Sequence, residues 1–222
     1  MGWIRRFDMS MTSERWLGLE QAADAVRRGE LVVLPTDTVY GLGADAFSHE
    51  AVAALLAAKG RDRGMPVPVL VGSPRTLDGI ATRLSPAARE LVEAFWPGGL
   101  TLVARVQPSL HWDLGETGGT VAVRMPLHPV AIELLQSTGP MAVSSANISG
   151  QPPATTADEA VEQLGEEVSV YLDGGPAGDA VPSTIVDVSG EIPRLLRAGA
   201  VTEEALREVV DDLLTEPYSD SS

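Results

Sequence analysis

The stretch "LTLVARVQPSLHWDLGETGGTVAVRMPLHPVAIELLQSTGPMAVSS", residues 100–145, decides the class of fold. Three apolar runs in it have the length and composition of buried strands, and one segment has the apolar spacing of a helix that begins at a proline. In order, the expected elements are a strand over 100–106, a polar loop over 107–119, a strand over 120–124, a helix over 129–137 and a strand over 141–145. Strands and a helix in one continuous stretch indicate a mixed α and β domain.

The same mixture continues on both sides of this stretch. Serine or threonine caps, Ser-Pro pairs and glycine stops mark the ends of the other helices. Toward the N-terminus we expect a helix capped by Ser13 and ending at Gly29, a strand near 30–34, a Gly-rich passage, a helix after Ser48, a strand over 67–72, and helices at Ser73-Pro74 and Ser85-Pro86. Toward the C-terminus we expect a helix over 157–164, strands near 168–173, 183–188 and 194–199, and a helix after Thr202.

The order of these elements predicts a layered domain built around one sheet of about seven strands. Short turns between the last strands make part of the sheet antiparallel, so a mixed sheet is expected. No internal repeat and no linker divides the chain, and we expect one domain over residues 13–214. Residues 1–12 have no clear period and are interpreted as a loose leader. The polar end of the chain, residues 215–222, is expected to be a disordered tail.

Composition excludes several classes of protein. The net charge is −15, from 16 basic and 31 acidic residues, which argues against a general surface for polyanions. Direct binding of tRNA is therefore left open, although a local basic cleft can still hold a nucleotide. The chain has no cysteine, so it has no disulfide and no thiolate metal site. No run of eighteen apolar residues exists for a membrane span, and we expect a cytoplasmic protein without membrane contact.

The only lysine of the chain, Lys59, stands two places before Arg61. A flexible ammonium beside a planar guanidinium makes a mixed anion site that two arginines do not reproduce. A second polar segment, "SSANISG" at residues 144–150, offers short hydrogen-bonding side chains at a strand end, where open α/β sheets commonly hold ligands. Each segment alone is more often a solvated helix end or a turn.

Basic and hydroxyl side chains also stand at the ends of other expected strands. Arg124 and Arg197 each end a strand, and an arginine there can hold a carboxylate or phosphate with two hydrogen bonds. Ser183 and Thr184 are similarly placed at the start of a strand. These residues make a cleft only if the ends of their strands converge.

Other patterns carry weaker interpretations. "GLGADA", residues 41–46, matches a dinucleotide fingerprint, but six residues separate it from the preceding apolar strand. The region about twenty positions on, where an acidic residue would hold the ribose, is mainly basic. Glycines that allow a tight turn are the better interpretation. The histidines, His49, His111 and His128, lie far apart, and helix capping explains two of them more simply than a metal does. We assign no metal ligand to the protein.

Six motifs in this order resemble the YrdC-like family of threonylcarbamoyl-AMP synthases over about residues 15–200. They are "LPTDTVYGLGADA", "KGR", "WPGGLTLV", "TVAVRMPLHP", "SSANISG", and "PSTIVDV" with "LLRAG". The resemblance implies a YrdC-like α+β fold, a three-layer arrangement of a twisted mixed sheet with helices on both faces. It also implies the reaction of L-threonine, bicarbonate and ATP to threonylcarbamoyl-AMP and pyrophosphate, which supplies the threonylcarbamoyladenosine modification of tRNA.

The resemblance also implies roles for individual residues. The catalytic set it implies is Lys59, Arg61, Ser145 and Asn147. ATP binding is implied for Lys59, Arg61, Met65, Thr120, Ser145, Asn147, Pro153 and Arg197, and threonine binding for Thr38, Leu70, Arg124, Val143 and Ser183. The implied cofactor is Mg²⁺ carried by ATP, with no organic cofactor, and the implied partner is a tRNA threonylcarbamoyl-transfer complex that receives the adenylate.

Four positions depart from the pattern of the family. Met65 stands where relatives often have a polar nucleotide contact, Leu70 stands where some carry a histidine, and Asp62 and Ser144 replace common prolines. Two alternatives to a synthase remain open. One is a paralogue of the same fold that binds nucleotide or RNA without efficient synthesis, and the other is an oxidoreductase that uses the glycines of residues 41–46.

Overall fold

The structure is a computed structural model that describes residues 4–178 and 181–215. The helices are α1 (Thr12–Arg27), α2 (His49–Ala58), α3 (Leu77–Ile80), α4 (Pro86–Phe95), α5 (Pro129–Thr138), α6 (Ala157–Leu164) and α7 (Glu203–Arg207), with 3-10 turns η1 (Pro74–Thr76) and η2 (Gly165–Glu167). The strands are β1 (Arg5–Asp8), β2 (Val32–Leu34), β3 (Gly41–Asp45), β4 (Val69–Leu70), β5 (Ala81–Thr82), β6 (Leu100–Val106), β7 (Thr120–Arg124), β8 (Met141–Ser145), β9 (Val170–Asp173), β10 (Thr184–Asp187) and β11 (Arg194–Arg197).

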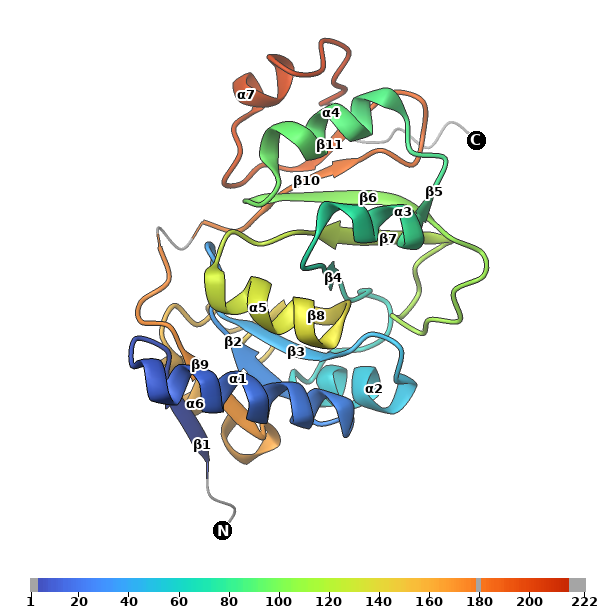
Figure 1. The fold of residues 1–222 in the computed structure, drawn as a ribbon. Coiled ribbons are helices and arrows are strands. Elements are labelled where there is room, and N and C mark those ends of the chain that lie inside the picture. Colours follow the sequence, from blue (N-terminus) through green and yellow to red (C-terminus); the bar gives the residue numbers. More distant parts are fainter. Residues whose placement is uncertain (1–3, 179–180, 216–222) are drawn as a thin grey trace.

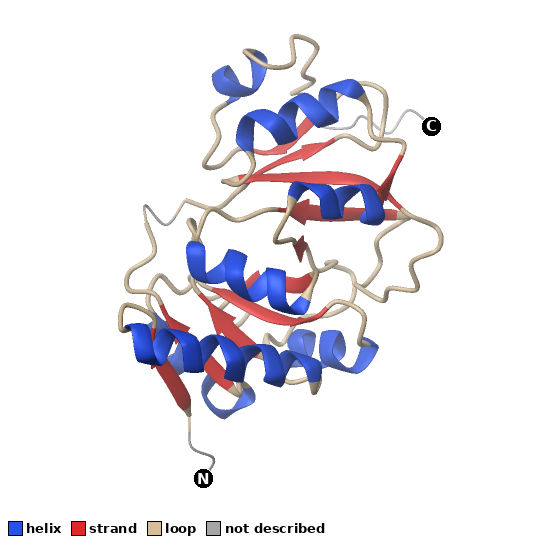
Figure 2. Ribbon diagram, viewed as in Figure 1, coloured by secondary structure: helices blue, strands red, loops and turns tan. Residues whose placement is uncertain are grey.

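One mixed sheet joins all of these strands. Its order is β1-β9-β2-β3-β8-β4-β7-β6-β10-β11, and β5 pairs with β6. The pairs β1/β9, β2/β9, β4/β7 and β6/β10 are parallel and the others are antiparallel. The two-residue strand β4 links a lower group of strands to an upper group, as Figures 1 and 2 show. The expected α+β fold with a mixed sheet is confirmed.

Alternation along the strands sends side chains to two separate apolar clusters, one on each face of the sheet. In β2, Val32 and Leu34 belong to one cluster and Val33 to the other. The first cluster is covered by α1 and α5, which contribute Val26 and Leu134 among others. The second is covered by helices that include α2, α4 and α6. Helices therefore lie on both faces (Figure 1), as expected.

The described residues contain eleven strands rather than about seven. One of the additional strands, β5, has only two residues, too few to give a sequence pattern, and the strand expected over 67–72 is shortened to the two residues of β4. Another is β3, which is built from the glycine segment that was expected to form a turn. That expectation was wrong because Gly41 and Gly43 pair with both neighbouring strands. A Cβ added to Gly41 would lie 2.6 Å from Val143 Cγ1, so glycine permits close packing there.

The segment interpreted as a loose leader contains β1, which corrects that interpretation for residues 5–8. β1 pairs with β9 in parallel from Arg5 to Asp8. Met9 is then buried against α1, and Met11 rather than Ser13 is the N-cap of that helix. Strand pairing with a segment more than 160 residues away leaves no local pattern in the sequence. The expected tail lies outside the described residues from position 216 onward.

Two further expectations concern helix starts. The Ser85-Pro86 pair begins α4 as expected, and the Ser85 hydroxyl accepts a hydrogen bond from Ala88 N at 3.1 Å. The Ser73-Pro74 pair begins only the turn η1 and the four-residue helix α3. Within residues 4–178 and 181–215, no helix has the length and apolar composition needed to cross a bilayer.

Candidate functional site

The end of α2 carries Lys59 into contact with the segment that follows β8. The helix begins at Ser48, whose hydroxyl accepts from Ala51 N at 3.2 Å, and Lys59 is its C-cap. The Lys59 side chain is only 2% exposed. Its Nζ donates to Ser145 O, to Asn147 O at 2.7 Å and to Asn147 Oδ1 at 3.2 Å. The structure thus brings together three of the four residues expected to form the catalytic set.

The buried ammonium of Lys59 has a shifted proton affinity. Burial, and then the positive charge of Arg61, lowers the pKa of Lys59 from 10.5 to about 8. Loss of solvent disfavours a charged group, whereas the three oxygen acceptors favour it. Burial is the larger of the two causes of the lowered pKa. Lys59 therefore gives up its proton more readily than an exposed lysine does.

Arg61 lies beside this cluster and is poorly bonded to the protein. Its Nη1 donates to Ser144 Oγ at 3.4 Å, a long hydrogen bond, and its Nε is buried without a partner. Burial lowers the pKa of Arg61. An arginine still carries its charge at neutral pH. The result is a cation with unused donors next to the segment that contains Ser145.

A second group of side chains surrounds Arg124, at the end of β7. Arg124 is 6% exposed, and three of its nitrogens donate to protein oxygens. Nε donates to Gly98 O at 2.9 Å, Nη1 to Thr38 Oγ1 at 2.9 Å and Nη2 to Asp37 Oδ1 at 2.6 Å. Asp37 Oδ1 also accepts from Leu127 N at 2.8 Å. The loop between β2 and β3 is thereby held against the end of β7.

A third group lies close to Arg124 on β10 and β11. Arg197 donates through Nη2 to Ser183 O at 2.7 Å and to Ser183 Oγ at 3.1 Å. The Ser183 hydroxyl lies 2.8 Å from Thr101 Oγ1 of β6. Burial lowers the pKa of both arginines, and the charge of Arg197 contributes to the shift at Arg124. The two guanidinium groups are thus near enough to interact.

A hollow of about 230 Å³ opens beside these two groups. Asp37, Val181, Gly199 and Ala200 line it. One lining residue, Asp37, forms an ion pair with Arg124 at an N–O distance of 2.6 Å, so the hollow adjoins a pair of charged side chains.

The remaining expected site residues are less closely tied to these groups. Leu70 and Val143 are buried in the apolar cluster under α1 and α5, although Leu70 pairs with Arg124 in the sheet. Thr120 stands at the opposite end of β7 from Arg124, and its hydroxyl donates to Thr117 O at 2.8 Å. Met65 is 52% exposed, and Pro153 is exposed in the loop after β8.

The loops of Met65 and Thr120 are nevertheless neighbours. Glu116 N donates to Arg63 O at 2.9 Å, and Val67 N donates to Leu114 O at 2.9 Å. The exposed loop that follows Arg61 therefore lies along the loop that leads into β7.

The histidines form no common site. His49 Nε2 lies 3.2 Å from His111 O, which is a contact between a ring and a backbone carbonyl. Capping explains neither His49 nor His128. Ser48 is the N-cap of α2, and His128 occupies the N-cap of α5 without a side-chain hydrogen bond, with its Nδ1 buried without a partner. Burial lowers the pKa of His128. In the described part of the chain, no group of three or more histidine, aspartate or glutamate side chains is placed to hold a metal ion.

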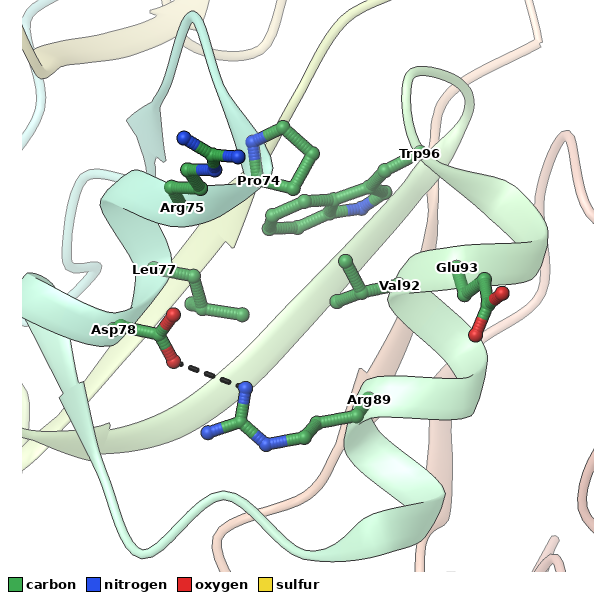
Figure 3. A pocket seen from close by; sticks show the side chains of 8 residues that line it. All are labelled: Pro74, Arg75, Leu77, Asp78, Arg89, Val92, Glu93 and Trp96. Atoms are coloured by element: carbon green, nitrogen blue, oxygen red, sulfur yellow. Dashed lines mark hydrogen bonds and ion pairs between the residues drawn. The ribbon is translucent and has the colours of Figure 1, made fainter.

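A larger hollow of about 350 Å³ lies elsewhere, between η1, α3 and α4. Figure 3 shows Leu77, Val92 and Trp96 facing its interior while the Arg89–Asp78 ion pair, at 3.0 Å, closes one side. None of the expected site residues lines it. Asp37, which holds Arg124, lines the smaller hollow, so size alone does not identify the site.

Two contributors to the site were not foreseen. Asp37 holds Arg124, and Thr101 meets Ser183. Asp37 stands between two threonines after the apolar strand β2, and such a polar cluster at a strand end was a signal in the sequence. Thr101 lies within a strand, where only the folded neighbours reveal a role. Ser144, part of the polar segment 144–150, accepts from Arg61.

Comparison with known proteins places these groups in context. A family model for the Sua5, YciO and YrdC proteins, described as "Telomere recombination", matches residues 24–199. A Mycobacterium tuberculosis protein named as a candidate threonylcarbamoyl-AMP synthase is 58% identical over 204 residues, which span 92% of this chain and 94% of that protein. The threonylcarbamoyl-AMP synthase of Bacillus subtilis is 39% identical over 194 residues, which span 86% of this chain and 56% of that protein.

A solved structure is similar over nearly the whole chain. Sua5 from Pyrococcus abyssi, complexed with L-threonine, superposes with a TM-score of 0.90 at 34% identity, and the match covers 97% of this chain and 63% of that chain. The chain thus spans almost all of the mycobacterial relative and little more than half of the longer relatives.

Proposed function

Because the chain belongs to the Sua5/YciO/YrdC family, we propose that it is an L-threonylcarbamoyladenylate synthase. It uses L-threonine, bicarbonate and ATP and releases threonylcarbamoyl-AMP, pyrophosphate and water. The observation that carries this proposal is the gathering of Lys59, Arg61 and the segment after β8, with a second cationic group around Arg124. Relatives named for this reaction, and a relative solved with L-threonine, support it.

Arg124 is suited to bind the carboxylate of threonine. A guanidinium has five N–H donors, and Arg124 gives one from each of its three nitrogens to the protein. One N–H is left on each terminal nitrogen. Two N–H groups side by side match the two oxygens of a carboxylate. Because Asp37 and Thr38 fix the guanidinium plane, little side-chain entropy is lost when the ligand binds.

Arg61, together with the nearby Ser144 and Ser145, is suited to bind the phosphates of ATP. Arg61 is partly exposed and makes one long hydrogen bond, to Ser144, so terminal N–H groups of its guanidinium are free for an anion. Mg²⁺ comes with ATP, bound to its phosphates as part of the substrate. The family resemblance implies further contacts of ATP at Thr120, Pro153 and Arg197.

The reaction needs positioning and charge stabilisation rather than a covalent enzyme intermediate. The threonine amine adds to the carbon of carbon dioxide, formed from bicarbonate with loss of water, and gives a carbamate and a proton. A carbamate oxygen attacks the α-phosphorus of ATP, and the bond to the pyrophosphate oxygen breaks. All reactants carry negative charge, so fixed cations around the reacting atoms lower the barrier.

The product supplies a further reaction. The mixed anhydride of threonylcarbamate and AMP is an acyl donor, so we propose that it passes to a tRNA threonylcarbamoyl-transfer complex. We also propose that the chain acts in the cytoplasm with this complex.

The direct test is detection of threonylcarbamoyl-AMP by mass spectrometry after the purified protein is mixed with the three substrates. We expect the adenylate, together with pyrophosphate release that requires threonine and bicarbonate. Each omission of one substrate is a control for ATP hydrolysis. ATP binding without any adenylate would instead indicate a paralogue that binds nucleotide without synthesis.

A further inference from the structure

The ammonium group of Lys59 has no donor left for a ligand. An ammonium has three N–H groups, and three protein oxygens lie around Nζ: Ser145 O, Asn147 O at 2.7 Å and Asn147 Oδ1 at 3.2 Å. With the side chain 2% exposed, water and phosphate have little access to Nζ. A direct contact with ATP would require breaking a buried, charged hydrogen bond.

The side chain of Asn147 is occupied in the same way. Its Oδ1 accepts from Lys59, and its two amide hydrogens go to Ile148 O at 2.9 Å and Gln151 O at 2.8 Å. The residue is 6% exposed. Asn147 therefore closes its own loop and has no polar group directed to a ligand.

The backbone of Lys59 extends this connection. Its carbonyl accepts from Ser149 N at 2.8 Å, so Lys59 is bonded to residues 145–149 through both its side chain and its main chain. Its position at the end of α2 fixes it to a helix with Leu55 fully buried. The segment that follows β8 is thus attached to a rigid element by four hydrogen bonds.

The groups left free beside this segment belong to Arg61 and Ser145. Arg61 is partly exposed and uses one of its five N–H donors, in the long bond to Ser144. Ser145 is also partly exposed, with a hydroxyl that makes no hydrogen bond within residues 4–178 and 181–215. These two side chains, unlike those of Lys59 and Asn147, have polar groups to offer an anion.

From this division we propose that Lys59 is a positioning residue rather than a contact of ATP. With Asn147 it holds the segment after β8 so that Ser145 faces the phosphates, while Arg61 supplies the N–H donors to them. The inference rests on the proposed function for the identity of the ligand. It differs from the role in ATP binding that the family resemblance implies for Lys59 and Asn147.

A double-mutant cycle on ATP affinity tests the inference without turnover. The variants are Lys59→Met, Ser145→Ala and the double variant, with ATP binding measured by calorimetry. If Lys59 acts through Ser145, Lys59→Met alone should raise the Kd for ATP about tenfold. In the Ser145→Ala background, the same substitution should change that Kd less than about threefold. Effects that multiply would mean that Lys59 contacts ATP directly, and would overturn the inference.

Two matched variants calibrate the cycle. Arg61→Met should weaken ATP binding about tenfold in both backgrounds, because a direct charged contact does not depend on Ser145. Arg63→Met, an exposed arginine of the same loop that pairs with Asp113, should leave ATP binding unchanged. Should Lys59→Met fail to fold, Lys59→Gln, which keeps two N–H donors, replaces it in the same cycle.

Hydrogen exchange separates failure of this inference from failure of the proposed function. In Lys59→Met without nucleotide, exchange should rise at residues 145–151 and stay unchanged in β6 and β10, which are remote from the lysine. Unchanged exchange at 145–151 would overturn the positioning role. A wild-type protein that binds ATP but makes no adenylate would count against the synthase assignment alone.

Discussion

At the scale of single residues, the buried charged side chains depend strongly on their hydrogen-bond partners. Arg124 is fixed by Gly98, Thr38 and Asp37, and Lys59 by Ser145 and Asn147. Removing one partner of a buried ion pair leaves the other partner without compensation. Conservative variants are therefore the informative ones at both sites.

Replacement of Arg124 by lysine should impair threonine binding selectively. The shorter ammonium side chain would keep a positive charge near Asp37 but would lack the two parallel N–H groups that match a carboxylate. We expect Arg124→Lys to raise the KM for threonine about tenfold or more, with the Kd for ATP nearly unchanged. Steady-state kinetics and calorimetry measure the two, and Arg75→Lys, at an exposed arginine, is the control. An unchanged KM would exclude Arg124 from the threonine site.

The low pKa of Lys59 should make its contribution to stability depend on pH. An unfolded lysine keeps its proton up to its ordinary pKa of 10.5, whereas in the fold the pKa is about 8. Unfolding thus takes up a proton between these values, and the free energy of unfolding rises with pH there, by at most about 1.4 kcal/mol per pH unit.

The measurement is urea denaturation of wild type and Lys59→Met between about pH 7.5 and 9.5. The difference between the two proteins should grow in favour of wild type as the pH rises, because other titrating groups are common to both. A difference that stays constant over this range would show that the pKa of Lys59 is not lowered.

At the scale of elements, the long strands and capped helices could be predicted from the sequence, and the strands β1, β3 and β5 could not. β6 has seven residues with a clear apolar pattern, and α4 begins at a Ser-Pro pair. β3 has no such pattern, since its first residue is Gly41 and its strand character depends on β2 and β8. Pairing between distant segments decides such elements, and a single sequence does not display it.

Gly41 should tolerate no side chain. A Cβ there would lie 2.6 Å from Val143 Cγ1, and a branched side chain in a strand has few rotamers to give way. We expect Gly41→Ala to lower the free energy of unfolding by about 1–3 kcal/mol. Chemical denaturation checks this value. Gly79→Ala, in α3 with nothing within 4 Å of the added carbon, is the control and should be neutral or slightly stabilising.

At the scale of the whole molecule, the sequence named most of the site residues but did not arrange them. The order of motifs predicted site roles for Lys59, Arg61 and Arg124, because the family resemblance assigns them together. Asp37 was missed, since its role depends on the end of β7 reaching the loop after β2. The sequence also could not reveal which hydrogen-bond donors are already used within the protein. We expected Lys59 to face a ligand, but in the fold its ammonium group donates to backbone carbonyls.

The net charge of −15 predicts weak affinity for tRNA. Binding to a phosphate backbone depends on many lysine and arginine contacts, and this chain has 31 acidic against 16 basic residues. We expect no saturable binding of tRNA at physiological salt, with a Kd weaker than about 10⁻⁴ M. Filter binding measures it, with a basic tRNA-binding protein as the positive control. Saturable binding at micromolar concentration would point to a basic surface that total charge conceals.

Because the only lysine is buried, its chemical reactivity should report local opening of the fold around it. An amine-directed label should react with the α-amino group of the folded protein and reach Lys59 only when the end of α2 separates from the segment after β8. A protease that cuts after lysine has a single target, so one scission of the 222-residue chain yields two fragments of about 59 and 163 residues. The rate of that single cut, with and without nucleotide, would read out the exposure of one bond in solution.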